Sequence, residues 1–396
     1  MKQFLTHWTF WKVVAALLLL LGAVATIVRF TMGLGAATNL SDQFPWGIWI
    51  GFDVLCGVGL AAGGFTLASI VYIFNIKKFE PIIRPTILTA FLGYVLVVFA
   101  LMFDLGRPWA IWHAIIMWNP RSVMFEVAWC VMLYTTVLAL EFAPVILEKF
   151  HLTKTIKFLK RISIPTIILG VLLSTLHQSS LGTLYLIVPS KLYALWYTPY
   201  LPVFFYVSAI SVGCAMVIFE SFLSSRAFNR GLEMPLLSEI GRVCVVVLAI
   251  VATMKYIDLK DRHVLDLLFV ARTETYLFWA EAIIGLIVPI ILLAQKRIRQ
   301  NPTGLFVSAI MVVLGFIMNR MNITVTGMEG WSGTTYIPSF LEFGTTIGIV
   351  TLGFVAFYLI AKYFPVFKEE HHEEETEEMK IDRVWMNDIK SVSSAA

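Results

Sequence analysis

Long apolar runs, separated by short polar segments, fill most of the chain. A helix needs about 20 mostly apolar residues to cross the hydrocarbon core of a bilayer. Runs that meet this length lie at 10–32, 47–75, 82–103, 122–146, 162–180, 200–224, 240–258, 273–295, 304–322 and 339–364. No soluble domain fits in the segments between them. The pattern therefore predicts an all-α, polytopic membrane protein with about ten transmembrane helices.

The amino-acid composition agrees with this prediction. The 396 residues are 59% hydrophobic and 14% charged, whereas a soluble domain is about 45–50% apolar and about 25% charged. The net charge of +4 arises from basic residues between the apolar runs, so it does not indicate a nucleic-acid partner. The first run is not expected to be a cleavable signal, because no polar cleavage region follows it and further apolar runs do.

Basic residues are concentrated on one side of the expected bundle. With the N-terminus inside, the inner connections carry Lys77, Lys78, Arg84, Lys149, Lys154, Lys157, Lys160, Arg161, Arg226, Arg230, Lys296, Arg297 and Arg299. The outer connections carry Arg107, Arg121, Lys191, Lys260 and Arg262. Because cytoplasmic loops are enriched in Lys and Arg, we expect both termini to be cytoplasmic.

The C-terminal residues differ in character from the rest of the chain. We expect one ten-helix transmembrane domain over 1–366, followed by an acidic cytoplasmic tail over 367–396. The charge run Glu369–Glu378 is typical of a solvated, disordered segment.

The sequence offers little redox machinery of its own. The cysteines Cys56, Cys130, Cys214 and Cys244 lie far apart inside apolar runs, so we expect small packing residues and no iron–sulfur cluster. A transmembrane b-type haem needs two histidines on facing helices, and only His177 lies clearly at the end of a run. No haem-attachment motif and no nucleotide-binding motif occurs. The chain is therefore predicted to lack haem.

Ionisable side chains gather near the expected outer interface. A carboxylate inside a membrane costs about 2.5–3.5 kcal/mol on insertion scales, so each one is a functional-site hypothesis. Asp104 and Arg107 are three residues apart and can be neighbours. A quinone headgroup needs hydrogen-bond donors, a proton donor or acceptor, and an apolar groove; His177 can serve one carbonyl while Asp104 or Glu126 supplies protons. The alternative is a structural Asp104–Arg107 pair with His177 as a hydrogen bonder at a helix end.

Buried acids form a second feature. Glu126 and Glu141 are fifteen residues apart, which is ~22 Å along a helix and within about 60° of one face. Together with Glu220 and Glu281 they can carry protons across the bundle, or each can make a separate interhelical hydrogen bond. The segment Asn319–Asn322 is expected to cap a helix and pair with Glu329 or Glu342 rather than to bind substrate.

Five sequence segments carry a resemblance to a known family. They are PWGIWIGFDVLCGVGLAAGG (45–64), FDLGRP (103–108), NPRSVMFEVA (119–128), LHQSSLGTLYLIVPSK (176–191) and NRMN (319–322). The chain resembles the NrfD/PsrC family of polysulfide-reductase membrane subunits. Within that family it is most similar to the HybB type, the membrane subunit of periplasm-facing uptake [NiFe] hydrogenases.

This resemblance implies a haem-free, quinone-binding subunit in a bacterial inner membrane, which does not act as an enzyme alone. It would exchange electrons with a periplasmic ferredoxin-like iron–sulfur subunit, attached to the large and small [NiFe] hydrogenase subunits or to their equivalents in a sister complex. Menaquinone or ubiquinone would be the bound substrate. The pocket positions it implies are Asp53, Asp104, Arg107, Glu126 and His177, with Glu126 resembling the family's proton-transfer glutamate.

Together, these interpretations give two sets of candidate residues. The proposed proton-transfer set is Asp104, Glu126, Glu141 and Glu220. The proposed quinone-binding set is Asp53, Asp104, Arg107, Trp109, His177 and Gln178. The rival hypotheses are a secondary transporter, for which no convincing internal repeat is found, and a purely structural anchor.

Overall fold

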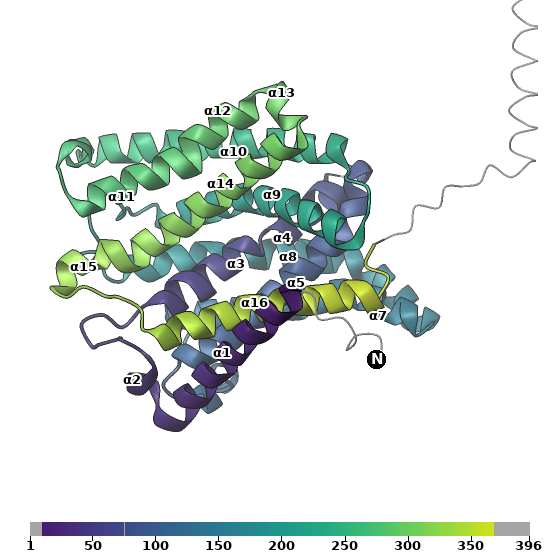
Figure 1. Ribbon diagram of the computed structural model, residues 1–396, viewed down its shortest axis with the longest axis horizontal. Helices are drawn as coiled ribbons and strands as arrows, with labels where there is room; N and C mark the ends of the chain where they lie inside the picture. The colour runs from purple at the N-terminus through teal and green to yellow at the C-terminus, as the bar shows by residue number, and fades with distance from the viewer. Residues whose placement is uncertain (1–9, 75, 368–396) are drawn as a thin grey trace, which may run out of the picture. The chain divides into compact units, whose positions relative to one another are not determined.

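The computed structural model describes residues 10–74 and 76–367, so the acidic run predicted after Phe367 lies outside the described residues. Nine helical segments in the described part are long and apolar enough to cross a membrane. They are α1 (Phe10–Met32), Trp49–Ile73, α5 (Glu80–Asp104), α7 (Val123–Lys149), α9 (Leu201–Phe228), α10 (Met234–Asp261), Thr273–Ala294, Pro302–Ser332 and α16 (Phe340–Tyr363). The predicted all-α, polytopic architecture is confirmed (Figure 1).

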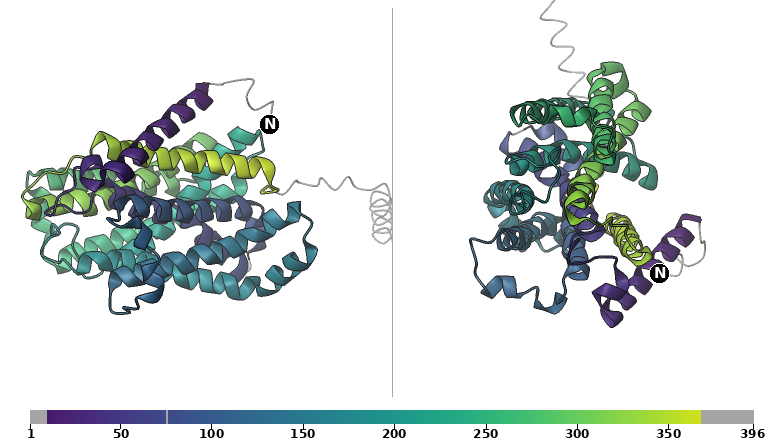
Figure 2. Two further views of the ribbon diagram at one scale, coloured as in Figure 1. Left: turned by 90° about the horizontal axis from the view of Figure 1, so that it is seen from below. Right: turned by 90° about the vertical axis from the view of Figure 1, so that its left-hand side faces the viewer.

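The predicted span at 162–180 is the apolar middle of α8 (Thr153–Leu186), a 34-residue helix outside the set of nine. Its first turns carry Lys154, Lys157, Lys160 and Arg161. Helix α8 packs against α7 and α9, and only residues 150–152 separate it from α7, so the two run antiparallel (Figure 2). Counting α8, the described chain contains ten long helical segments. The start of α1 and the end of α16 therefore lie at the same end of the bundle (Figure 1).

Several of the long segments are interrupted by π-helical turns, which the sequence did not predict. The segment Trp49–Ile73 consists of η2 (Trp49–Cys56), α3 (Gly57–Leu60), α4 (Gly63–Ala68) and η3 (Ser69–Ile73). The segment Thr273–Ala294 consists of α11 (Thr273–Ala282), η7 (Ile283–Ile287) and α12 (Val288–Ala294). The segment Pro302–Ser332 consists of α14 (Pro302–Met321), η8 (Asn322–Thr326) and α15 (Gly327–Ser332). Such π-turns are frequent at functional sites.

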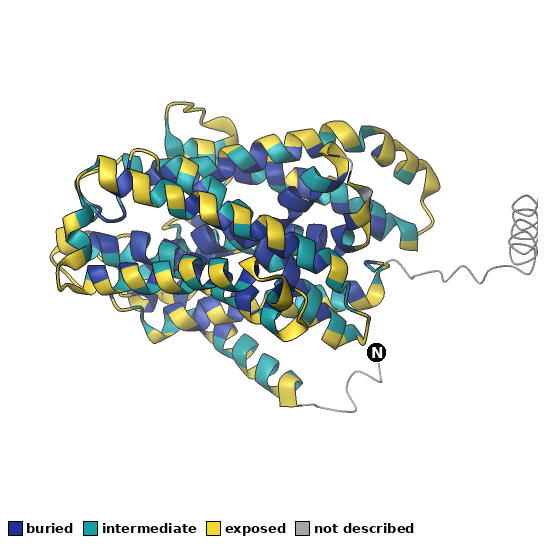
Figure 3. Ribbon diagram, turned by 90° about the horizontal axis from the view of Figure 1, so that it is seen from above, coloured by how far each residue is buried: buried dark blue, intermediate teal, exposed yellow. Residues whose placement is uncertain are grey.

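Short helices occupy the connections. They are α2 (Leu34–Ala37), η4 (Lys77–Phe79), η5 (Pro108–Ala110), α6 (His113–Ile116), η6 (Leu265–Phe269) and α13 (Lys296–Arg299). Buried residues line the inner faces of the long helices, and exposed residues follow their outer faces (Figure 3). Many of the exposed side chains are large and apolar, as on α1, which fits helices that face lipid.

Two groups of helices meet at α9. We call residues 49–186 the N-terminal half and residues 201–332 the C-terminal half. Helix α9 packs against α4 and α8 on one side and against α10 and α14 on the other. Glycines allow the closest contacts: a Cβ built on Gly315 would lie 2.0 Å from the Cα of Gly285, so α14 and η7 touch through their backbones.

Candidate functional site

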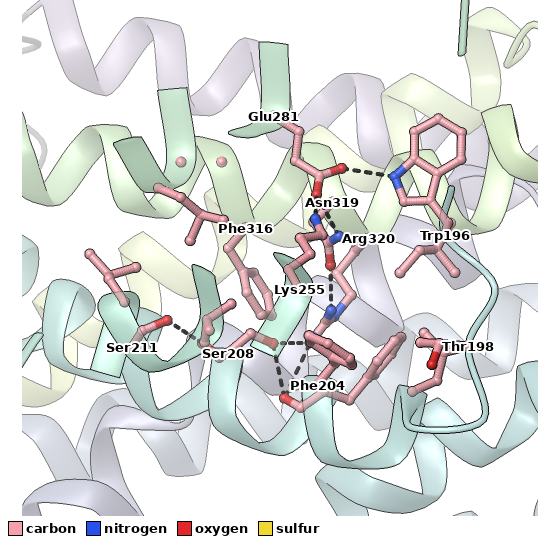
Figure 4. Close-up of a pocket in the computed structure, with 18 of the residues that line it drawn as sticks. Trp196, Thr198, Phe204, Ser208, Ser211, Lys255, Glu281, Phe316, Asn319 and Arg320 are labelled. Carbon is pink, nitrogen blue, oxygen red and sulfur yellow. Dashed lines mark hydrogen bonds and ion pairs between the residues drawn. The ribbon is translucent and has the colours of Figure 1, made fainter. Parts of the chain in front are cut away.

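A cavity of about 70 Å³ lies in the C-terminal half, between α9, α10, α14 and the Thr273–Ala294 segment (Figure 4). Its polar lining includes Ser208, Lys255, Glu281, Asn319 and Arg320, and its walls are mostly apolar and aromatic. A buried water needs roughly 10–15 Å³ by this kind of measure, so the cavity has room for a few small molecules of that size.

Glu281 is the centre of the polar network beside this cavity. It is 3% exposed, and both of its carboxylate oxygens are occupied. Oε1 contacts the ammonium of Lys255 and accepts a bond from Asn319 Nδ2 at 2.8 Å. Oε2 accepts bonds from Trp196 Nε1 and Asn322 Nδ2, each at 3.0 Å. Four partners from separate elements therefore hold one buried acid, and we call this group the Glu281 network; Figure 4 labels Glu281 with Lys255, Asn319 and Trp196.

Arg320 lies next to the Glu281 network and is 1% exposed. Its Nη1 donates to Asn319 Oδ1 at 2.6 Å and its Nη2 donates to Ser208 Oγ at 2.8 Å. The rings of Phe205 and Phe316 lie 3.6 and 4.4 Å from its guanidinium carbon. Within the described part of the chain, Nε has no hydrogen-bond partner and the guanidinium forms no ion pair with a carboxylate.

The predicted partners of the segment Asn319–Asn322 are wrong. This segment pairs with Glu281, whereas Glu342 caps α16 in a capping box with Ser339 and Glu329 accepts a bond from Tyr336 N. The cause is that the helical path continues through η8 to Ser332, so the segment lies inside a span and faces α9 and α11. Trp196, on the connection before α9, is also buried and donates to Glu281 in the same network.

The N-terminal half contains a different polar group, the His177 cluster, made of Tyr94, Tyr134, Ser174 and His177. The His177 ring is fully buried and lies 5.6 Å from the Tyr94 ring, which lies 4.6 Å from the Tyr134 ring. Both nitrogens of His177 have no hydrogen-bond partner among the described residues, and the hydroxyls of Tyr94 and Tyr134 approach the Ser174 hydroxyl without forming a well-aligned hydrogen bond. The sequence suggested that His177 lies at a helix end. It lies inside α8, because this helix continues to Leu186.

Glu126 and Glu141 both face α8, as their spacing predicts. Glu126 is exposed on α7, and its Oε1 accepts a bond from Ser180 Oγ at 2.5 Å. Glu141 lies against Gly170, where a Cβ would come 3.4 Å from its Oε1. Since Ser180 follows His177 by three residues, Glu126 meets α8 about one turn from the His177 cluster.

Two further candidates lie on the inner faces of helices around this cluster. Gln178 is 1% exposed and donates from Nε2 to the carbonyl of Val58 at 3.2 Å. Glu220 is buried on α9, close to Thr89 of α5. Each thus joins α8 or α9 to the segment beside it. Glu281, which the sequence placed in the same chain of acids, belongs instead to the separate network of the C-terminal half.

Asp53 and Asp104 lie away from the His177 cluster. Asp53 is 6% exposed and accepts a bond from Thr346 Oγ1 on α16 at 2.7 Å. Asp104 is the last residue of α5, and it interacts electrostatically with Arg29 of α1 and with Glu342 of α16. Arg29 also donates to the carbonyls of Phe103 and Leu105, at 2.7 and 2.8 Å. Sequence reasoning missed Arg29, whose only signal is a base inside an apolar run.

The expected Asp104–Arg107 pair does not form in the described structure. Helix α5 ends at Asp104, so the three-residue spacing no longer places the two side chains on one face. Arg107 is exposed, and Trp109 is 72% exposed on the connecting segment. The structure therefore brings Glu126, His177 and Gln178 together on α7 and α8, and it separates Asp53, Asp104, Arg107 and Trp109 from them.

The fold and its buried polar clusters define an integral membrane subunit of the multi-pass helical class. Residues 36–329 match the family model described as "Polysulphide reductase, NrfD", and the chain belongs to this family. It is accordingly a multi-pass protein of the cytoplasmic membrane and an NrfD-type oxidoreductase membrane subunit.

Three relatives cover nearly the whole chain. A protein of Nitratidesulfovibrio vulgaris is 38% identical over 373 residues, which is 90% of this chain and 94% of the relative. The probable Ni/Fe-hydrogenase 2 b-type cytochrome subunit of Escherichia coli is 33% identical over 86% of this chain and 88% of its own length. The integral membrane subunit of menaquinone reductase from N. vulgaris is 29% identical, with 85% and 87% covered.

The name of the E. coli relative raises the question of a b-type haem in this chain. Two histidines on facing helices would be needed to hold one inside the bundle. His177 is the one histidine buried in the described part of the chain, and it packs against Tyr94. The described residues do not fit a bis-histidine haem, and the predicted lack of haem stays a prediction.

Proposed function

We propose that this chain is the quinone-interacting membrane subunit of a multisubunit respiratory oxidoreductase. It passes electrons between a periplasmic ferredoxin-like iron–sulfur subunit and the membrane quinone pool. Its family membership supports this role, as do relatives named menaquinone reductase membrane subunit and Hdr-like menaquinol oxidoreductase membrane subunit. The E. coli relative favours the large and small subunits of a [NiFe] hydrogenase as catalytic partners.

The observation that carries this proposal is the His177 cluster. Buried polar atoms almost always have hydrogen-bond partners, and exceptions call for an explanation. A neutral imidazole supplies one donor and one acceptor, and each tyrosine hydroxyl supplies a donor. Two quinone carbonyls need such donors, and the quinol hydroxyls need acceptors. The His177 ring and the Tyr94 hydroxyl therefore form the proposed headgroup contacts, with Gln178 fixing α8 through Val58.

Protons for the quinone are proposed to come through the acids around α8. Glu126 bonds to Ser180 one turn from His177, and Glu141 faces the same helix further along α7. Glu220 lies on α9, near Thr89 of α5. A positioned acid or base contributes about 10²–10⁴-fold to a proton-transfer step. Asp53, Asp104, Arg107 and Trp109 lie elsewhere, and this mechanism does not depend on them.

The test is quinone-linked turnover by the assembled complex with His177→Ala and His177→Gln. The alanine variant should lose about 100-fold or more in kcat/KM for quinone, and the glutamine variant should recover part of this loss because it can donate and accept. Turnover of the partner subunits with a water-soluble electron acceptor should not change. His113→Ala on α6 is the matched control, because it removes a histidine outside the cluster.

Full quinone turnover by a normally assembled His177→Ala variant would refute the proposed site and favour a purely structural anchor. The partner complex is tested separately, by purifying the tagged chain from its native membrane and identifying its co-purifying subunits. Hydrogenase large and small subunits are expected, and a different catalytic subunit would assign the chain to a sister complex.

A further inference from the structure

Three arginines are buried in the described part of the chain, and their surroundings differ. Arg29 donates to two backbone carbonyls and interacts with Asp104. Arg299 donates to the carbonyls that end α12, in a connection rich in lysine and arginine. Arg320 alone among the three lines the cavity of the C-terminal half. Of these three arginines, Arg320 is therefore the one whose charge faces this cavity.

The charges around this cavity do not balance. Asp258 and Arg262 pair with each other across one turn of α10, so they contribute no net charge. The remaining charged groups of the lining are Lys255 and Arg320, both positive, and Glu281, which is negative. Glu281 balances Lys255, with which it forms an ion pair. One positive charge, that of Arg320, is left inside a membrane bundle, where an uncompensated ion is strongly unfavourable.

The contacts of Arg320 leave at least one of its donors available to a ligand. Phe205 and Phe316 contact its guanidinium, while Asn319 and Ser208 hold its two terminal nitrogens. Nε is the donor without a partner among the described residues. The carboxylate of Glu281 presents little repulsion to a second anion, because each of its oxygens is already engaged by two partners.

We propose that this cavity is a binding site for a small monovalent inorganic anion of halide size, which neutralises Arg320. The volume of about 70 Å³ suits a halide with one or more waters. It is smaller than the roughly 150 Å³ apolar cavity that takes a benzene ring, so its size suits a halide better than a quinone headgroup. The site is separate from the quinone site proposed in the N-terminal half, because none of its lining residues belongs to residues 49–186.

The experiment measures thermal unfolding of the full chain in lipid nanodiscs while sodium bromide replaces sodium gluconate at constant ionic strength. Bromide should raise the unfolding midpoint saturably, by about 2–6 °C, as a ligand that binds the folded state does. Arg320→Gln should abolish the bromide response. Arg299→Gln is the matched control: it removes another buried guanidinium outside the cavity and should leave the bromide response intact.

A second variant keeps the proposal testable if Arg320→Gln does not fold. Val251→Leu adds one methylene to an apolar residue that lines the cavity, and it should weaken bromide binding about tenfold or more. Val246→Leu on the lipid-facing side of the same helix should have no such effect. Equal stabilisation by gluconate, or an undiminished bromide response in Val251→Leu, would overturn the proposal.

Discussion

The Glu281 network and the His177 cluster are both buried and polar, but they differ in how their atoms are bonded. In the C-terminal half, every oxygen of Glu281 has two partners from different elements. In the N-terminal half, five polar atoms of four neighbouring side chains have no partner among the described residues. Fully bonded polar networks make a core rigid and specific. Unbonded polar atoms are available to a ligand, so the first region is suited to stability and the second to binding.

This difference can be tested because the two regions should respond differently to substitution. Removing one partner of a buried ion pair leaves the other charge uncompensated, which lowers stability strongly. Removing a hydroxyl that has no hydrogen-bond partner among the described residues removes an unfavourable buried group, so stability should hold while ligand contacts are lost.

The largest effect is expected for Glu281→Ala. This change removes the common acceptor of Lys255, Trp196, Asn319 and Asn322, and it leaves the Lys255 ammonium without its ion-pair partner. It should therefore lower the free energy of unfolding by about 3–5 kcal/mol. Denaturant unfolding in mixed micelles measures the change. Glu329→Ala, a carboxylate at the end of the same helical segment as Asn319, is the control and should shift stability by less than about 1 kcal/mol. A wild-type unfolding curve for Glu281→Ala would contradict the structural role of the network.

Glu126→Gln should affect activity rather than stability. The amide oxygen can still accept the bond from Ser180, but the side chain no longer exchanges a proton. Quinone-linked kcat should fall about 10²–10³-fold, with KM for quinone changed little. Steady-state kinetics of the assembled complex provide the measurement. Glu148→Gln, at the other end of α7 and paired with Arg84, is the matched control. Undiminished kcat in Glu126→Gln would remove Glu126 from the proton path.

Tyr94→Phe should raise KM for quinone about tenfold, because it deletes one proposed donor to a carbonyl. Its unfolding free energy should remain within about 0.5 kcal/mol of the wild type, since the hydroxyl has no partner among the described residues. Parallel kinetics and unfolding experiments separate the two effects. A loss of stability without a change in KM would mean that the hydroxyl serves packing, and the contrast between the two clusters would then fail.

Thr346→Val should give the smallest effect. Asp53 accepts one side-chain hydrogen bond, from Thr346. It therefore has fewer hydrogen-bond partners than Glu281 and more than His177. Losing that bond should cost about 0.5–1.5 kcal/mol and leave quinone turnover unchanged. Denaturant unfolding and turnover of the same preparation measure both. A large loss of turnover would return Asp53 to the functional site.

The sequence predicts the helices well because each span coincides with a local run of apolar residues. The placement of Glu126 and Glu141 toward one helix was also predictable, since it depends only on the 3.6-residue period within α7. The π-turns could not be predicted, because a fully apolar span has no periodic pattern that a local change would disturb. The sequence did not predict the pairing of Glu281 with Asn319 and Asn322 for a different reason. These residues lie on separate helices, and tertiary packing alone decides which helices meet.

Helix α9, the first helix of the C-terminal half, also packs against α4 and α8, so it contributes side chains to the interior of both halves. Glu220 on this helix faces the N-terminal half near Thr89, while Ser208 holds Arg320 in the C-terminal half. Expressing either half alone would expose an apolar surface of α9 that the other half buries. The two halves are therefore expected to fold as one unit. A small rotation of α9 would move Glu220 and Ser208 together, and so change the polar contacts in both halves.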